Sequence, residues 1–209
     1  MKFNILIEFQ SPEDIYMSIA RRSPGWHEGV GNEKEEIVWY AMRATYRREL
    51  SVKQTLDELS IESFIPMRYT IHLEKGRKKK RLVPVIHNLI FVHATPSVVK
   101  EIKGRIQHLQ YMMHTVDGKK TPIIVPDNQM LPFIAITQTY DEKLLFLDPQ
   151  NIDLVKGEKV RICGGALDGC EGRFIKVLGR KAKHLVISIQ NIISVATAIV
   201  PAGCIEKIG

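Results

Sequence analysis

Residues 156–177 read KGEKVRICGGALDGCEGRFIKV. The stretch combines a turn, a β-rich run, a glycine-rich loop and a second β-rich run. Gly164, Gly165 and Gly169 allow positive φ angles in the loop, and Gly172 permits close approach of another backbone where the second run begins. Each glycine in the interior of a helix costs about 1 kcal/mol relative to alanine. The stretch therefore predicts two strands and makes a helix over the same residues costly.

The rest of the C-terminal region follows the same pattern. Short β-rich runs alternate with Gly or Asn turns about every 8 to 12 residues, at 159–163, 172–178, 184–189 and 196–200. This spacing is typical of a small all-β barrel. We therefore expect residues 154–209 to form a β domain in the free protein.

The N-terminal half mixes strand and helix periods. Residues 37–42 read IVWYAM, a strand in which Trp39 and Tyr40 are expected to anchor the core. Val52, Leu56 and Leu59 then form one apolar stripe, which predicts a helix. An α+β domain over residues 36–140 is the expected result.

Later segments of this domain continue the alternation. Two strand-like stretches, 63–73 and 82–93, flank the segment EKGRKKKR at 74–81, which predicts a hairpin with a basic tip. Thr95 and Pro96 begin a second helix. A third helix starts at Asp127, and Pro132 makes it short or kinked. Periodicity fades over residues 141–153, which we interpret as a linker, and residues 1–35 form an N-terminal extension.

The charge favours an anionic partner. The 209-residue chain has a net charge of +7 and a pI of about 9.3. Basic and acidic side chains number four and six in residues 1–35, 17 and 13 in 36–153, and nine and four in 154–209. Both predicted domains are therefore basic, as expected for a nucleic-acid partner, although many solvated surfaces carry such a charge.

Residues that would support catalysis or metal binding are few. The three cysteines form no C-x-x-C pair, and the seven histidines have no metal-ligand spacing. We interpret Cys163 and Cys170 as small core residues. We therefore expect no disulfide, no metal, no cofactor and no enzymatic activity. Apolar runs are shorter than the roughly 18 residues of a membrane span, and Glu8 interrupts the N-terminal one, so a cytoplasmic protein without membrane contact is expected.

Two groups of motifs carry a family resemblance. The stretch 156–177 resembles a KOW motif. Upstream, Trp39-Tyr40, the sequences FIPM at 64–67 and HNLIFV at 87–92, and PIIVPD at 122–127 follow one another in an order that resembles the NusG family of transcription elongation factors. The ending at 187–201 most resembles the specialised paralogues that act on polysaccharide-biosynthesis operons. This chain has His87-Asn88-Leu89 where the family usually has Pro-Gly-Tyr or Pro-Asn-Tyr, and residues 1–35 lie outside the pattern.

The resemblance implies an α+β fold, in which an N-terminal antiparallel sheet flanked by helices is joined by a linker to a small SH3-like all-β KOW barrel. In the family, the open face of the first sheet binds a coiled coil on the largest RNA polymerase subunit. The matching positions here are Ala41, Arg43, Leu89 and Phe91, with Tyr46 near the edge. Strand alternation places Leu89 and Phe91 on one face, where ordinary core packing is the alternative.

Further partners are expected for the basic residues and the barrel. The residues expected to contact phosphates of upstream or non-template DNA are Arg47, Arg48, Lys78, Lys79, Lys80 and Arg81. A solubilising hairpin tip is the alternative for Lys78–Arg81. The resemblance implies that Leu167, at the tip of the glycine loop, contacts a ribosomal protein or a termination factor, and the alternative is a plug at the barrel end.

The sequence thus predicts a non-enzymatic transcription elongation or antitermination factor that serves specific operons such as surface polysaccharide loci. The alternative is an RNA-binding or ribosome-associated KOW protein, whose basic surface binds RNA directly.

Overall fold

The computed structural model describes residues 35–140, 144–147, 157–163, 169, 171–176, 183–189, 192–196 and 205–208. The predictions for Leu167, for the glycine loop at 164–168 and for nearly all of the N-terminal extension lie outside the described residues. No helix in these ranges is long and apolar enough to cross a membrane.

The first sheet is antiparallel and has five strands in the order β2-β5-β1-β6, with β9 also paired to β1. Its strands are β1 (Val38–Ala44), β2 (Glu62–Phe64), β5 (Leu89–Ala94), β6 (Leu109–Tyr111) and β9 (Ile124–Val125). Trp39 and Tyr40 are both buried, on opposite faces of β1, which confirms them as core residues. The sheet therefore has an apolar side chain to bury on each face.

Three α-helices cover the two faces of this sheet. They are α2 (Glu49–Glu58), α3 (Pro96–Arg105) and α4 (Asp127–Thr137), and the 3₁₀ turn η1 (Thr45–Arg47) precedes α2. Helices α2 and α3 pack on the face that carries Tyr40, Met42, Ile90 and Val92. Helix α4 packs on the other face, where Phe133 contacts Phe91 with ring centroids 6.4 Å apart.

The predicted helix starts agree with the structure in two places. Pro96 occupies the first turn of α3, and the Thr95 side chain accepts a hydrogen bond from the Val98 N–H at 3.4 Å. Helix α4 contains Pro132 and begins after Pro126, without a side-chain cap from Asp127. The helix extends over 11 residues because Met130, Phe133 and Ile134 bury its apolar side in the core.

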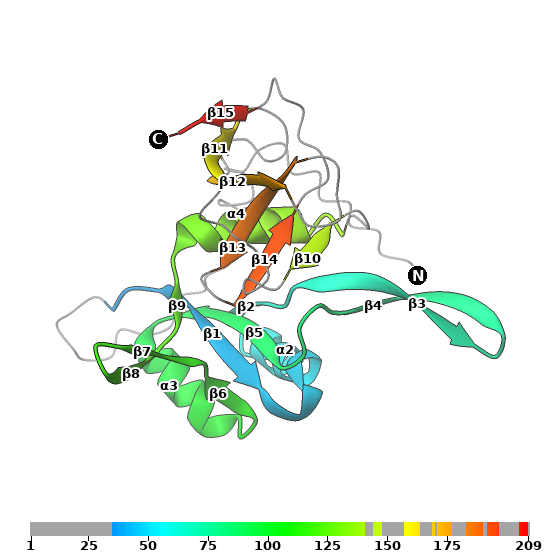
Figure 1. Cartoon of the computed structure of the whole chain (residues 1–209). Helices are drawn as coiled ribbons and strands as arrows, with labels where there is room; N and C mark the ends of the chain where they lie inside the picture. Colours follow the sequence, from blue (N-terminus) through cyan, green and yellow to red (C-terminus); the bar gives the residue numbers. More distant parts are fainter. Residues whose placement is uncertain are drawn as a thin grey trace.

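Two hairpins project from the first domain (Figure 1). One joins β3 (Met67–Glu74) to β4 (Arg77–Pro84), and the other joins β7 (Met113–Val116) to β8 (Lys119–Pro122). The Lys75-Gly76 and Asp117-Gly118 turns have positive φ at both residues, as in the two-residue turns that match strand twist. The prediction of a basic tip over 74–81 was wrong in extent, because Lys78–Arg81 pair with Thr70–Leu73 along β4.

The second sheet is antiparallel and has six strands in the order β10-β14-β13-β12-β11-β15. These are β10 (Leu145–Leu147), β11 (Glu158–Ile162), β12 (Glu171–Lys176), β13 (Lys183–Ile189), β14 (Ile193–Ala196) and β15 (Ile205–Lys207). Most of the residues described between 154 and 209 therefore lie in strands, as predicted. Closure into a KOW barrel stays a prediction.

The predicted linker, 141–153, contains a strand of this sheet. Leu145, Phe146 and Leu147 form β10 and pair with Ala196, Val195 and Ser194 of β14. All three are half-buried, because burying three consecutive apolar side chains is more favourable than leaving them exposed to water in a linker. This part of the linker prediction is corrected.

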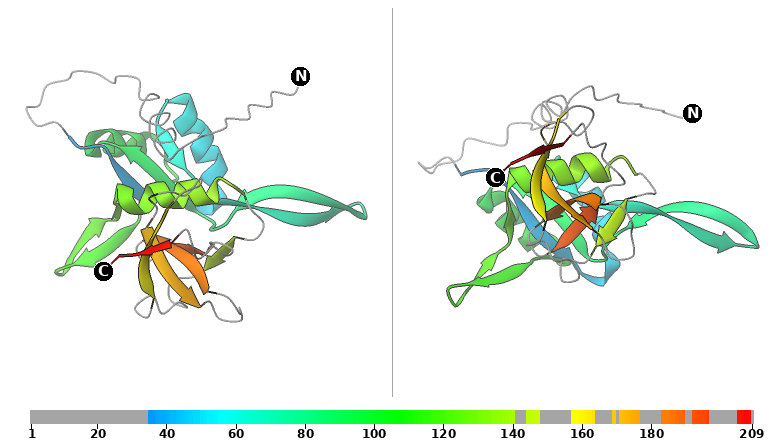
Figure 2. Two further views of the ribbon diagram at one scale, coloured as in Figure 1. Left: turned by 90° about the horizontal axis from the view of Figure 1, so that it is seen from above. Right: turned by 45° about the horizontal axis from the view of Figure 1, so that its top comes forward.

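One apolar cluster joins the two sheets. It contains Trp39 and Phe91 of the first sheet, Phe133 of α4, and Leu185 and Ile187 of β13. Figure 2 shows the second sheet on the side of α4 away from α2 and α3. The second sheet therefore lies over the same face of the first sheet as α4.

Candidate interaction surfaces

The sharp turn between β1 and α2 gathers four of the predicted site residues. Arg43, Tyr46, Arg47 and Arg48 are all exposed, and Tyr46 is 81% exposed. Tyr46 and Arg47 have φ angles of 60° and 55°, a conformation that non-glycine residues adopt infrequently. Two such residues in succession persist only where neighbouring groups hold them.

Asn88 holds this turn from the loop before β5. Its Oδ1 accepts a hydrogen bond from the Arg47 N–H at 2.7 Å, and its carbonyl oxygen accepts one from the Ala44 N–H at 2.9 Å. Asn88 itself has a φ of 65°, which asparagine tolerates better than most residues. The turn and the loop therefore form one structural unit.

Glu49 anchors the same unit from inside. Its side chain is buried in the first turn of α2, and its Oε2 accepts a hydrogen bond from the Asn88 N–H at 3.2 Å. Its Oε1 lies 3.4 Å from His87 Nδ1. A carboxylate in this position is favoured by the positive end of the helix dipole. Sequence reasoning missed Glu49 and Asn88; the signals were an acidic residue in a first helical turn and the departure from the family pattern at His87-Asn88.

The apolar part of the predicted polymerase surface is covered. Ala41, Leu89 and Phe91 are at most 2% exposed, and they belong to the cluster shared with α4 and the second sheet. The expectation that this sheet face is open was therefore wrong for the structure described here. The physical reason is that apolar side chains of α4 and β13 bury it from water. Of the five predicted residues, Arg43 and Tyr46 are accessible.

A cavity of about 290 Å³ lies between the exposed Arg43 and the buried Leu89. It is lined by Arg43, Ile86, His87, Asn88, Leu89, Met112, His114, Ile123 and Ile192. Ile192 precedes β14, so the second sheet closes one side of this cavity. The accessible and the covered residues are thus neighbours on one surface.

The basic residues of the hairpin are separate from this edge. Lys79 Nζ lies 2.7 Å from Glu74 Oε2, Arg81 also pairs with Glu74, and Lys80 Nζ lies 4.2 Å above the Tyr69 ring. Glu74 therefore neutralises part of the charge. Arg47 and Arg48 lie on the β1–α2 connection, so the structure does not bring the six predicted phosphate contacts into one cluster.

No group of three or more His, Cys, Asp or Glu side chains within the described ranges could hold a metal ion. Cys163 is exposed after β11, with its Sγ 3.9 Å from Glu206 Oε2, so its interpretation as a core residue was wrong. The thiol lies where the strand ends and its side chain turns to solvent.

A family model described as "Transcription termination factor nusG" matches residues 37–134. Residues 37–134 form a NusG family domain. Among solved structures, the chain is similar to one described as "Domain interaction in Thermotoga maritima NusG", with a TM-score of 0.40 and 15% sequence identity over 83% of this chain and 98% of that chain. The search of curated proteins found no match.

The NusG domain contains the first sheet, α2, α3 and most of α4. All predicted polymerase-binding and nucleic-acid-binding residues, which span positions 41–91, lie inside it. The second sheet begins after residue 134, outside the matched range.

Proposed function

We propose that the chain is a non-enzymatic transcription elongation or antitermination factor that binds RNA polymerase through its NusG domain. The observation that carries this proposal is the family match over residues 37–134. The β1–α2 turn supports it, because Glu49 and Asn88 hold two strained, exposed residues in place. Strain of this kind is concentrated at functional sites.

Polymerase binding proceeds from the accessible edge to the covered face. Arg43 and Tyr46 make the first contacts with the coiled coil of the largest subunit, since both are exposed. Ala41, Leu89 and Phe91 become available when α4 and the second sheet move off this face of the first sheet. The coiled coil then replaces both over an apolar surface of matching chemistry.

Nucleic acid and a second protein complete the set of partners. Arg47, Arg48 and the Lys78–Arg81 segment contact phosphates of upstream or non-template DNA. The second domain is a KOW domain, in which Leu167 docks on a ribosomal protein or a termination factor. The factor acts in the cytoplasm on specific operons, such as surface polysaccharide loci.

The test compares RNA polymerase binding by the wild-type chain and by the double variant Arg43→Ser/Tyr46→Ser. Arginine and tyrosine are typical binding hot spots, and their loss is expected to weaken binding at least tenfold. The matched control is Arg105→Ser/Val116→Ser, which removes one arginine and one exposed apolar side chain elsewhere in the NusG domain. Equal affinity of all three proteins for polymerase would overturn the proposed surface.

Ribosome co-sedimentation distinguishes the alternative function, RNA or ribosome binding, from the proposed one. A chain that sediments with ribosomes and does not bind RNA polymerase would be the RNA-binding or ribosome-associated KOW protein. The proposed function requires the reverse, with polymerase binding that depends on Arg43 and Tyr46.

A further inference from the structure

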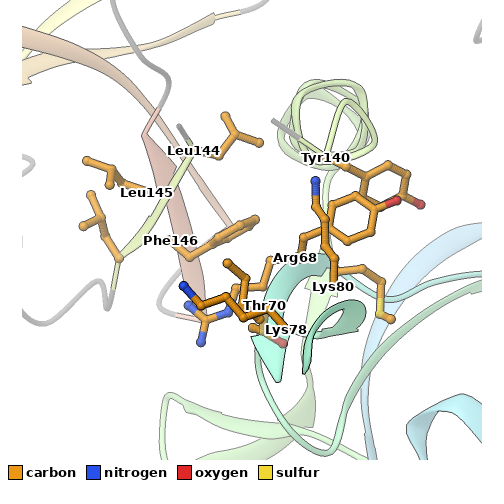
Figure 3. A pocket seen from close by; sticks show the side chains of 12 residues that line it. Arg68, Thr70, Lys78, Lys80, Tyr140, Leu144, Leu145 and Phe146 are labelled. Atoms are coloured by element: carbon orange, nitrogen blue, oxygen red, sulfur yellow. The ribbon is translucent and has the colours of Figure 1, made fainter. Parts of the chain in front are cut away.

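A second, larger cavity lies at the base of the β3–β4 hairpin. Its volume is about 790 Å³, which is within the usual range for binding sites. Residues of β3 and β4 line one side, and residues 144–147, which contain β10, line the other. Figure 3 shows Leu144, Leu145 and Phe146 across this space from Tyr140 and Lys80. We call it the hairpin groove.

The lining of the groove is mainly apolar. Eight of its twelve residues are Leu, Ile, Met, Phe or Tyr. Ile71 is 70% exposed, and Tyr69 and Tyr140 are each about two-fifths exposed. Burying such side chains against another apolar surface removes them from water and is favourable. The groove therefore favours an occupant with an apolar face.

The β10 side of the groove is also the edge of a sheet. Among the described residues, β10 pairs with β14 alone, so its other edge presents backbone N–H and C=O groups to which a further strand can bind. Phe146 packs on the cluster that contains α4, whereas Leu145 and Leu147 pack with Ile175 and Val186 on the opposite face of the second sheet. A strand added beside β10 therefore needs apolar side chains on both of its faces.

Residues 3–9, FNILIEF, have the pattern that this edge requires. Successive side chains of a strand point to opposite faces, and aromatic and β-branched residues favour strands. One face of this segment would be entirely apolar, with Phe3, Ile5, Ile7 and Phe9. The other face would carry Leu6 between Asn4 and Glu8. The segment thus offers a broad apolar face and, on its other face, one leucine between two polar residues.

The chain is long enough to bring this segment to the groove. Glu35, the first described residue, accepts a hydrogen bond from the Ser97 N–H at 3.1 Å, at the start of α3. Residues 10–34 connect the segment to this point and span up to roughly 80 Å when extended, whereas a folded chain of this length has a radius of gyration of roughly 17 Å. Residues 1–35 are also acidic and the rest of the chain is basic, so their charges attract.

We propose that residues 3–9 bind in the hairpin groove as an additional strand beside β10. The face of Phe3, Ile5, Ile7 and Phe9 packs toward the hairpin, and Leu6 lies on the face that carries Leu145 and Leu147. Strand addition of this kind takes its affinity from backbone hydrogen bonds and its specificity from alternate side chains. The added strand contacts the NusG domain and the second sheet together, so it ties β10 to the β3–β4 hairpin. RNA polymerase and DNA take no part in this contact.

Hydrogen exchange in the full-length chain tests the strand. Amides of residues 4–8 that pair with β10 should be protected at least tenfold relative to their intrinsic exchange rates. Ile71→Ser should reduce this protection about tenfold, because the strand no longer buries that side chain. Ile71 is mostly exposed, so the variant should keep the wild-type thermal midpoint. The matched control is Val116→Ser, which removes an exposed apolar side chain from the other hairpin and should leave the protection unchanged.

A second variant acts from the side of the segment. Ile5→Ser/Ile7→Ser removes two apolar side chains outside both folded domains and should abolish the protection at residues 4–8. Exchange at those β10 amides that point away from β14 should rise with it. The matched control is Ile15→Ser/Ile19→Ser, which removes two isoleucines from another part of the N-terminal extension and should behave like wild type.

A labelled peptide with the sequence of residues 1–10, MKFNILIEFQ, tests whether the groove is occupied in the same chain. By fluorescence anisotropy, it should bind the full-length Ile5→Ser/Ile7→Ser variant at least tenfold more tightly than wild type, because the tethered segment competes at a high effective concentration. Adding Ile71→Ser to that variant should weaken peptide binding about tenfold.

Several results would overturn the proposal. They are unprotected amides at residues 4–8 in wild type, protection that survives both Ile71→Ser and Ile5→Ser/Ile7→Ser, or failure of the peptide to bind the double variant. Equal peptide binding by wild type and the double variant would show a groove left open for a strand of another protein. Protection that grows with protein concentration would show exchange of the segment between two copies of the chain. These assays contain no polymerase, so their outcome is independent of the Arg43/Tyr46 test.

Discussion

Replacing Gly172 by alanine tests how closely β12 approaches β13. A Cβ atom added at this position would lie 2.8 Å from the Val186 carbonyl oxygen and 2.9 Å from Leu185 Cδ1. Ordinary contact begins at 3.4 Å, so the backbone oxygen would have to move by about 0.6 Å. The Leu185 side chain is fully buried and has little room to rotate away.

The expected cost is that of overpacking a close-packed site. Val186 is held in the sheet by its pairing with Arg173, so a shift of its carbonyl disturbs the β12–β13 ladder. Overpacking of this kind costs about 1–3 kcal/mol. We expect the free energy of unfolding of the second sheet to fall by about 2 kcal/mol, which raises its open population roughly 30-fold.

Hydrogen exchange at the β12 and β13 amides, together with urea unfolding, measures this change. The matched control is Gly104→Ala in α3, where no atom lies within 4 Å of the new Cβ. The same substitution there should stabilise the helix by about 0.5–1 kcal/mol. If Gly172→Ala leaves stability within about 0.5 kcal/mol of wild type, the inferred close approach is incorrect.

Three other predictions concern the NusG domain. Phe133→Ala removes the ring that contacts Phe91 and should cost about 3–5 kcal/mol in urea unfolding. Burial raises the pKa of the Tyr40 hydroxyl. The neutral phenol therefore contributes its full stability below about pH 10, and this contribution is lost as the pH rises through the folded-state pKa. Tyr40→Phe should accordingly lose less thermal stability than wild type between about pH 9 and 11. Serine at all four positions of Lys78–Arg81 should weaken DNA contact in an elongation complex and flatten its salt dependence.

Each of these has a result that contradicts it. A Phe133→Ala chain that unfolds at the wild-type urea concentration would place the ring outside the core. Identical alkaline profiles for wild type and Tyr40→Phe would show that burial does not favour the neutral phenol. An unchanged salt slope for the serine variant would mean that Lys78–Arg81 only make the hairpin soluble. The control is polymerase binding without DNA, which the serine substitutions should leave unchanged.

Local structure followed from local pattern. The IVWYAM run predicted β1, Thr95-Pro96 predicted the start of α3, and Gly172 predicted the close approach that β12 makes to β13. These features depend on neighbouring residues, on the period of apolar side chains and on the φ angles that glycine or proline allows. The same reasoning misplaced the basic hairpin tip, because the pairing of Lys78–Arg81 with Thr70–Leu73 extends both strands beyond their apolar runs.

What covers each surface was decided by tertiary structure. Alternation placed Leu89 and Phe91 on one face of β5, but it carries no information on whether α4 and β13 lie over that face. The role of Asn88 depends on Glu49, 39 positions away, and the cavity beside Arg43 is lined by NusG-domain residues together with Ile192, which precedes β14. The sequence by itself determined which residues are apolar, charged or conformationally free; packing determined which of them meet, because contacts between distant segments depend on how whole faces bury one another.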